Sequence, residues 1–238
     1  MVNIDTVYQN VLALANKEQR GYITPQEFNL FADQAQMEIF EQYFYDINQF
    51  KRRPSTSSPR YDIVESIKEK ISIFNVNSLV VTHGFTLPDN IYRIGDCWAT
   101  TTNNPTDSSA IQIELIDQED LVKSQAGPLI KATEKRPIFY LHHNQVYFQP
   151  QTITGKTYRI NAIKRPTPPN WTYLIDSDNQ NALYNSTATD HQDFELHASE
   201  EPKLIVKILQ LAGVSIKDFN LAQSAAQKEI SVKQQEKQ

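Results

Sequence analysis

Apolar residues at helical spacing mark the first part of the chain as α-helical. From Ile4 to Ala15 they recur every three or four positions, as they do on the buried face of an amphipathic helix. A second run with this spacing, at residues 63–74, predicts a shorter helix. We therefore expect residues 1–82 to form an N-terminal helical zone.

A long helix is predicted to begin within the segment YITPQEF. Thr24 is a favourable N-cap residue, Pro25 suits the first helical position, and Glu27 stands at the capping-box position. We expect this helix to continue to about Phe50, before the segment KRRPSTSSP, and to be about 40 Å long.

The predicted long helix carries more apolar surface than one buried face requires. A helix on the surface of a monomer needs a single apolar stripe, and this one has two, shifted around the helix axis. Either the helix packs between other helices of the same chain, or part of its surface meets another protein. Our candidates for a protein interface are four aromatic residues of this helix and two apolar residues near the C-terminus: Phe28, Phe31, Phe40, Phe44, Leu221 and Ile230.

The middle of the chain, residues 83–196, has the pattern of short β-strands. The segment IQIEL alternates apolar and polar residues, as a half-buried strand does, and Asp117 after it is expected to cap a short helix over QEDLVKSQ. The turn sequences TGK, PTPPN and DSDNQ separate further strand-like segments such as KTYRINAIKRP, WTYLI and NALYN. Several short strands with turns between them indicate an antiparallel β-sandwich or barrel.

The last part of the chain, residues 197–238, is again predicted to be helical. Ser199 is a candidate N-cap for a helix over EEPKLIVKILQLA, and Gly213 is a natural terminator. A final helix after Asp218 is expected to give way to a nearly all-polar tail. The sequence therefore predicts an α+β protein. Its two helical zones, expected to pack together as one domain, flank a central β domain.

The segment EKRPIFYLHHNQVYFQP places two histidines, His142 and His143, between two aromatic runs. Neighbouring residues of a strand point to opposite faces, so adjacent histidines in one strand cannot both bind the same ion, although a turn could bring them closer. A zinc site would need further ligands, and none of the other histidines has a helpful spacing. We expect a β-hairpin with His143 and Asn144 as its two-residue turn, and no bound metal.

The remaining candidates for chemistry are weak. Asp89, Asp96 and Glu114 are acidic residues from which a catalytic carboxylate pair would be drawn, although most such residues are simply solvated. DSDNQ resembles part of a calcium loop but lacks its glycine and distal glutamate. The basic residues 51–53 fall at the expected end of the long helix, where cations complement the helix dipole; a contact with DNA or an acidic partner is the minority alternative. No GxxxxGK[ST], GxSxG or CxxC motif is present, so we expect no enzymatic activity and no cofactor.

Composition and charge narrow the function further. The 238 residues include a single cysteine, Cys97, which excludes an intramolecular disulfide. The sequence has no apolar run long enough to span a membrane and no secretory signal at its start, so we expect synthesis in the cytoplasm. The formal net charge is −5. A protein that wraps nucleic acid needs a basic face, so this charge argues against tight DNA binding.

Several local phrases, together touching most of residues 20–220, resemble the head-to-tail connector proteins of short-tailed bacteriophages. The likeness is to ring proteins of crAss-like phages and, more distantly, to the tail tubular protein A, or gatekeeper, group. The phrases are YITPQEFNLFADQAQMEIFEQYF, FTLPDNIYRI, RPIFYLHHNQVYFQP, KRPTPPNW and DFELHASEEPKLIVKILQLAGVSIKD.

The resemblance implies a structural role. Proteins of that family are wedges with helices around a β domain, and many copies, usually twelve, form a ring below the portal protein of the virion. The ring extends the DNA channel and presents a surface to the tail. The implied partners are further copies of the chain, the portal or a neighbouring ring, and a tail component. Double-stranded DNA passes through the lumen without specific binding. The implied location is the virion neck, and no catalytic or cofactor residues come with the family.

Two other classes of function remain open from the sequence. Eleven tyrosines and two tryptophans on a β scaffold would suit a tail-associated module that binds a glycan or receptor. Long helical zones at both ends are unusual for such a module. A hydrolase is the third class, and the missing motifs argue against it.

Overall fold

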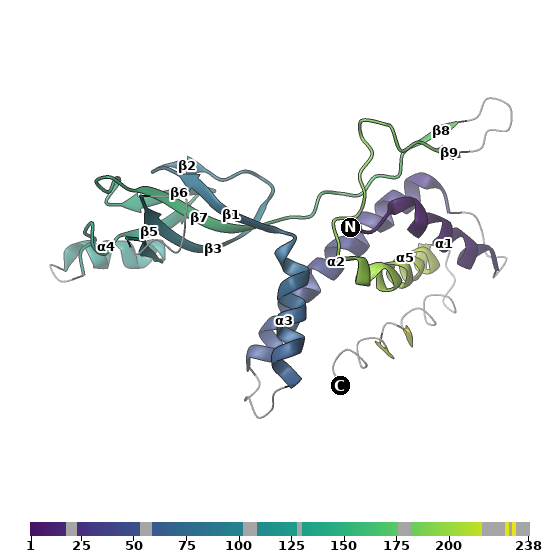
Figure 1. Cartoon of the computed structure of the whole chain (residues 1–238), viewed down its shortest axis with the longest axis horizontal. Coiled ribbons are helices and arrows are strands. Elements are labelled where there is room, and N and C mark those ends of the chain that lie inside the picture. Colours follow the sequence, from purple (N-terminus) through teal and green to yellow (C-terminus); the bar gives the residue numbers. More distant parts are fainter. Residues whose placement is uncertain are drawn as a thin grey trace. The chain divides into compact units, whose positions relative to one another are not determined.

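The protein was analysed as a computed structural model, which describes residues 1–17, 23–52, 59–101, 109–127, 130–175, 182–215, 227–228 and 230–231. Their contacts divide the chain into two compact units. The helical unit comprises Met1–Ile73 and Pro166–Gln238, and the β unit comprises Phe74–Arg165 (Figure 1). The predicted α+β class, with helical zones at both ends and a mostly antiparallel, barrel-like sheet between them, is confirmed.

The helices and strands follow one another in a simple order. The helical unit contains α1 (Ile4–Lys17), α2 (Pro25–Arg52), α3 (Pro59–Ser72), β8 (Tyr173–Ile175), β9 (Ala182–Tyr184), the 3-10 helix η1 (Ala198–Glu200) and α5 (Glu201–Ser215). The β unit contains β1 (Asn75–Val81), β2 (Phe85–Thr86), β3 (Ile91–Thr100), β4 (Ile111–Leu115), α4 (Gln118–Ala126), β5 (Ile138–His142), β6 (Gln145–Gln149) and β7 (Thr157–Lys164).

The sheet of the β unit curls because its two edge strands are consecutive in sequence. The strand order is β1-β7-β3-β4-β5-β6-β2, so β1 and β2 lie at opposite edges. Only residues 82–84 separate them, and the sheet must therefore bend until its edges approach. All pairs are antiparallel except β4 and β5, whose parallel pairing is made possible by the crossover through α4.

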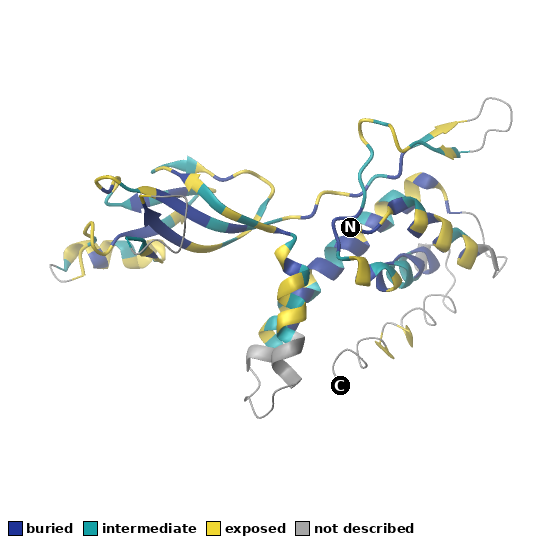
Figure 2. Cartoon of the chain, in the orientation of Figure 1, coloured by how far each residue is buried: buried dark blue, intermediate teal, exposed yellow. Residues whose placement is uncertain are grey.

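Alternating residues of the strands fill the barrel. In β6, Val146 and Phe148 are buried while their neighbours are partly exposed, as the two-residue period of a strand requires. The ring of Phe148 stacks on that of Tyr158 in β7, with centroids 3.9 Å apart and an interplanar angle of 4°. Buried strand residues appear as dark bands along the sheet in Figure 2.

Three helices, α1, α2 and α5, form the core of the helical unit. The predicted start of α2 is confirmed: the Thr24 backbone N–H donates to Oε2 of Glu27 over 3.0 Å, and the Glu27 N–H donates to Oγ1 of Thr24 over 3.3 Å. Hydrogen bonds from Thr24, chiefly from its backbone N–H and then from its side chain, lower the pKa of the Glu27 carboxyl group. The apolar core is made of residues at helical spacing on all three helices: Ile4, Val7, Val11, Phe28, Ala32, Ala35, Ile39, Leu204, Ile208 and Ala212.

Side chains of α2 hold the irregular segment that leaves the β unit and leads to α5. Gln36 is fully buried; its Nε2 donates to the Thr167 carbonyl over 2.8 Å, and its Oε1 accepts from the Glu195 N–H over 3.1 Å. Two turns earlier on the helix, Asn29 Oδ1 accepts from the Trp171 N–H over 2.9 Å. These bonds satisfy backbone groups that have no partner in a sheet or helix.

Several local expectations differ from the structure. Residues 75–81 form a strand of the β unit, and residues 166–196 belong to the helical unit, so the units do not meet at the expected residues 83 and 196. A short apolar run does not distinguish a helix end from a strand. In sequence the β8–β9 ribbon looks like any other pair of strands. No local pattern therefore indicates that it belongs to the helical unit.

The expected helix caps differ too. The residue capping η1 is His197, whose Nδ1 accepts from the Ser199 N–H, and Ser199 lies inside that 3-10 turn. Helix α5 continues past Gly213 to Ser215. Asp117 precedes α4 as expected, but its side chain makes no capping hydrogen bond. Most of the predicted final helix lies outside the described residues.

A buried carboxylate joins three elements of the helical unit. Glu200 is 1% exposed and pairs with Lys70 of α3, and its other oxygen lies 3.7 Å from Nζ of Lys203 in α5. Replacing Glu200→Gln would remove the buried negative charge that faces the ammonium groups of Lys70 and Lys203. We expect this change to lower the free energy of unfolding by about 3 kcal/mol or more, measured by urea denaturation. The matched change Glu65→Gln, at an exposed position of α3, should have little effect. Equal stability of the two variants would contradict the role assigned to Glu200.

The turn that brings the two sheet edges together depends on a glycine. Gly84 has φ +77°, and its N–H donates to the Val146 carbonyl over 2.8 Å. An added Cβ would meet no atom within 4 Å, so the cost of Gly84→Ala is conformational. We expect a loss of about 1–2 kcal/mol in thermal or urea unfolding. Gly127→Ala is the control, because Gly127 has φ −93° and ordinary contacts. Destabilisation by both changes alike would contradict the conformational explanation.

Candidate interaction surfaces

Both apolar stripes of α2 are used mainly inside the helical unit. Phe28 and Phe40 are fully buried, which assigns them to the core and favours packing between helices of the same chain for these two candidates. Phe31 and Phe44 are half-buried, and the Phe44 ring packs edge-on against Phe40 with centroids 5.1 Å apart. Of the two C-terminal candidates, Leu221 lies outside the described residues and Ile230 is exposed.

The solvent side of α2 nevertheless carries two large apolar side chains. Leu30 is 72% exposed and Tyr45 is 65% exposed. They are separated by about four helical turns and so project from nearly the same side of the helix. Sequence reasoning missed them because the residues three and four positions away from each are polar, whereas the phenylalanines formed continuous stripes.

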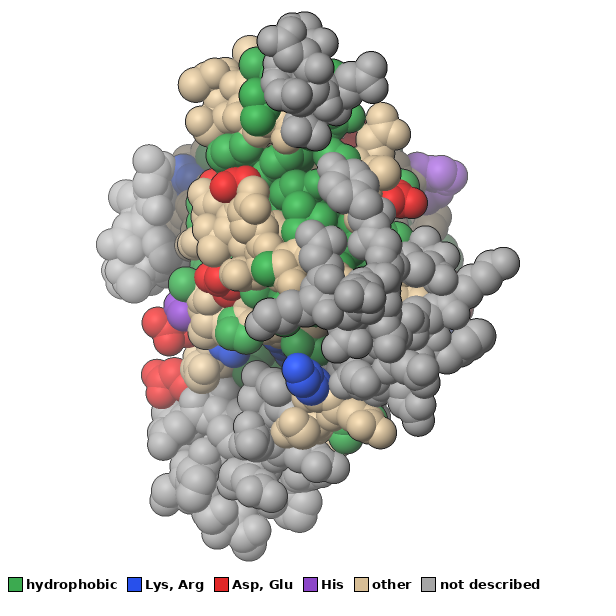
Figure 3. Space-filling view, turned by 90° about the vertical axis from the view of Figure 1, so that its right-hand side faces the viewer, with side chains coloured by type: hydrophobic (Ala, Val, Ile, Leu, Met, Phe, Trp, Pro, Cys, Tyr) green, Lys and Arg blue, Asp and Glu red, His purple; other side chains and the backbone are tan. Residues whose placement is uncertain are grey.

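The β8–β9 ribbon is the most apolar exposed element of the helical unit. It is a two-stranded sheet in which Leu174 lies directly opposite Leu183 and Ile175 opposite Ala182. Leu174, Leu183 and Ile175 are each more than half exposed. Because successive strand residues point to opposite faces, the two leucines lie on one face and Ile175 on the other. Figure 3, which views the molecule from the side of the ribbon, shows hydrophobic side chains gathered on this surface.

The base of the ribbon is firmly attached to the helices. Trp171 is buried, its Nε1 donates to Oδ1 of Asp5 in α1 over 2.9 Å, and its ring lies 4.3 Å from that of Tyr8. The rings of Tyr173 and Tyr184, a cross-strand pair, both stack on Trp171 with centroids 5.7 Å away. The ribbon is thus anchored at one end, while its apolar residues beyond the anchor remain more than half exposed.

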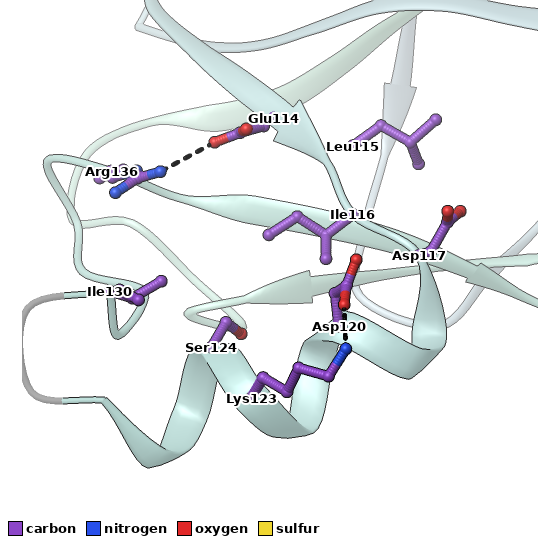
Figure 4. A pocket seen from close by; sticks show the side chains of 9 residues that line it. All are labelled: Glu114, Leu115, Ile116, Asp117, Asp120, Lys123, Ser124, Ile130 and Arg136. Carbon is purple, nitrogen blue, oxygen red and sulfur yellow. Dashed lines mark hydrogen bonds and ion pairs between the residues drawn. The ribbon is translucent and has the colours of Figure 1, made fainter.

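A hollow of about 560 Å³ lies beside α4 in the β unit. Figure 4 shows the residues that line it, with Ile116 and Ile130 among the apolar ones, one ion pair between Glu114 and Arg136 and another along α4. Arg136 Nη2 lies 3.2 Å from Glu114 Oε2, and Lys123 Nζ lies 2.8 Å from Asp120 Oδ1. The hydrogen bond to Asp120 and the charge of that carboxylate raise the pKa of the Lys123 ammonium group.

Most of the charged and hydroxyl groups of this hollow are already engaged with partners. Two of its carboxylates already face a cation, and Ser124 donates its hydroxyl to the Leu121 carbonyl over 2.8 Å. Ser124 therefore lacks the hydrogen-bonded base that activates a serine nucleophile. The β3–β4 register pairs Cys97 with Ile113, which brings the backbone positions of Asp96 and Glu114 next to each other, and Glu114 is already engaged in an ion pair with Arg136.

The histidine pair forms the tip of a hairpin, as predicted. His143 and Asn144 have φ of +47° and +62°, the two positive values that a type I′ turn requires. Nδ1 of His143 lies 2.6 Å from Nε2 of His142, a hydrogen-bond distance. Within the described part of the chain, no group of three or more His, Cys, Asp or Glu side chains is arranged to hold a metal ion.

The other sequence candidates make no site. Cys97 is buried in the barrel, and this burial raises the pKa of its thiol, which keeps it protonated and unreactive. Burial, followed by the charges of Cys97 and Glu134, raises the pKa of Tyr158 to about 12. The DSDNQ segment and the side chains of residues 51–53 lie outside what the structure describes.

No protein-family model and no curated protein matches the chain. None of the described helices is both long enough and apolar enough to cross a membrane.

We expect the purified protein to retain no stoichiometric zinc. The two rings of His142 and His143 contact each other directly, which leaves no space between these nitrogens for an ion with Zn–N bonds of about 2 Å. The check is elemental analysis after exposure to zinc and dialysis. One zinc per chain, lost in the double change His142→Ala and His143→Ala, would overturn this prediction.

Proposed function

We propose that the chain is a structural subunit of a homo-oligomeric ring in the virion neck of a short-tailed bacteriophage, joining the portal to the tail. The proposal combines the resemblance to connector proteins with one structural observation, the uncovered apolar β8–β9 ribbon. An isolated two-stranded ribbon is marginally stable in water and exposes two unpaired edges. A neighbouring subunit that covers Leu174, Leu183 and Ile175 would remove both problems.

Two further observations support a ring. Leu30 and Tyr45 add two exposed apolar side chains on α2. A closed ring requires two different surfaces on each subunit, because each copy contacts one neighbour on either side. The hollow beside α4, with apolar residues and charged groups at its walls, is a second surface of suitable chemistry in the β unit.

The charge of the protein suits a channel for DNA. A basic lumen would hold phosphates through many ion pairs and slow the passage of the genome. The formal net charge of −5 favours a conduit that DNA crosses without being gripped. Twelve copies in register with the portal is the stoichiometry that the family likeness suggests, and the neighbours are the portal or another ring and a tail component.

Substitutions in the apolar surface should weaken assembly without unfolding the subunit. We expect Leu174→Asp and Leu30→Asp each to shift the protein from rings to smaller species, because a charge would have to be buried at the contact. Size-exclusion chromatography with light scattering, with and without portal, measures this. Asn10→Asp is the control, since it adds the same charge at an exposed position of α1, outside the residues proposed for the contact.

The result depends on separating assembly from folding. Each variant should keep the thermal unfolding midpoint of the wild-type subunit to within a few degrees. A wild-type protein that remains monomeric with and without portal would contradict the proposed function. Rings formed equally well by both apolar-surface variants would show that these residues do not lie at the contact.

A further inference from the structure

The β unit contains two adjoining hollows that the ring function does not use. One, of about 610 Å³, is lined by residues of β5 and β6 and of the segment between α4 and β5. The other, of about 400 Å³, lies next to β1 and β7. They share two lining residues, His83 and Gln151, and are therefore adjacent; we call the two together the groove. Each hollow has a volume within the range of small-molecule binding sites.

Aromatic rings form one wall of the larger hollow. Tyr140 and Tyr147 are directly opposite each other on β5 and β6, and their rings stack with centroids 5.4 Å apart and an angle of 14°. The His83 imidazole packs edge-on against Tyr147 at 5.2 Å. Its Nδ1 lies 3.0 Å from the carbonyl oxygen and 3.2 Å from the backbone nitrogen of Phe148, which fixes the ring in place. The wall is therefore preorganised.

Glutamine side chains supply the polar part of the groove. Gln125, Gln149 and Gln151 line the larger hollow, and Gln151 lines both. Each amide offers donors and an acceptor, and within the described residues none of the three bonds to another side chain or to the backbone through its amide. Alternating donors and acceptors beside aromatic rings match a ligand that has hydroxyl groups on its rim and apolar C–H faces.

The charges along the groove further restrict the ligand. Among the described residues that line the two hollows, Lys131 and Lys156 are cationic and none is Asp or Glu. Lys156 donates to the backbone carbonyl of Ser109 and not to a carboxylate. A cationic ligand is therefore disfavoured, and a carboxylate on the ligand would find an ammonium group in each hollow. Two lysines are too few to neutralise a run of phosphates, which argues against a nucleic-acid strand.

We propose that this groove binds an oligosaccharide, with uronate-containing chains preferred over neutral ones. One sugar ring would pack against Tyr140 and Tyr147, glutamine amides would bond its hydroxyls, and Lys131 would meet a carboxylate. The neighbouring hollow would accept the next sugar, with Gln151 between the two. Tyr140 and Gln151 belong neither to the apolar ribbon and α2 nor to the hollow beside α4, so binding through these two residues can be tested separately from ring assembly.

The full-length protein should be screened against an array of neutral and uronate-containing oligosaccharides, and the best binder then titrated by calorimetry. We expect Tyr140→Ala and Gln151→Ala each to weaken binding about tenfold or more. Tyr140→Phe, which keeps the ring, should lose less than Tyr140→Ala. The controls Tyr92→Ala and Gln112→Ala change the same residue types on β3 and β4, outside the groove, and should retain full affinity.

The outcomes distinguish this proposal from the ring function. Groove variants should form the same oligomers as the wild type, so loss of saccharide binding with assembly intact supports the inference. Binding of neutral chains alone, with the same dependence on Tyr140 and Gln151, would support the saccharide site and reject its acidic preference. Absence of saccharide binding, or equal losses in the groove and control variants, would overturn it whatever the oligomeric state.

Discussion

The helical unit depends on polar side chains of one helix that satisfy the backbone of an irregular segment. Gln36 of α2 bonds both to Thr167 and to Glu195, so a single buried amide holds the beginning and the end of that segment. Asn29 does the same for Trp171. An unpaired backbone group buried away from water is costly, so these amides determine where the segment can lie. The position of the ribbon base and the start of η1 follow from them.

This arrangement explains why an apolar ribbon can be displayed without collapsing onto the helices. Trp171 is fixed by Asp5 and by stacking on Tyr8, and the tyrosine pair at the base of the ribbon stacks on Trp171 in turn. The anchor is stabilised by aromatic packing in the core of the helical unit. Leucines and Ile175 beyond it contribute little to that core and are available for a contact elsewhere.

Local signals in the sequence predict much of the fold, and they fail where the outcome depends on distant contacts. The capping residues Thr24 and Glu27 and the turn at His143-Asn144 act within a few residues, so their structures could be foreseen. That β1 belongs to the sheet could not be foreseen, because it depends on pairing with β7 more than 70 residues later. For the same reason the placement of residues 166–196 with the helices, through Gln36, left no local trace.

The candidate surfaces show the same limit. Stripes of phenylalanine on α2 correctly indicated a helix with more than one buried face, but burial by α5 and by the segment after the β unit cannot be read from the helix itself. Phe28 and Phe40 are therefore core residues, while the isolated Leu30 and Tyr45 remain exposed. The saccharide groove arises from cross-strand neighbours such as Tyr140 and Tyr147, whose proximity depends on the register of the hairpin.

The most direct test of the central claim is a cryo-electron microscopy reconstruction of the assembled protein. We expect a closed ring in which Leu174, Leu183 and Ile175 of each subunit are buried against a neighbouring subunit. A ring in which the β8–β9 ribbon is exposed to solvent, or a protein that forms no ring with its portal, would contradict the account.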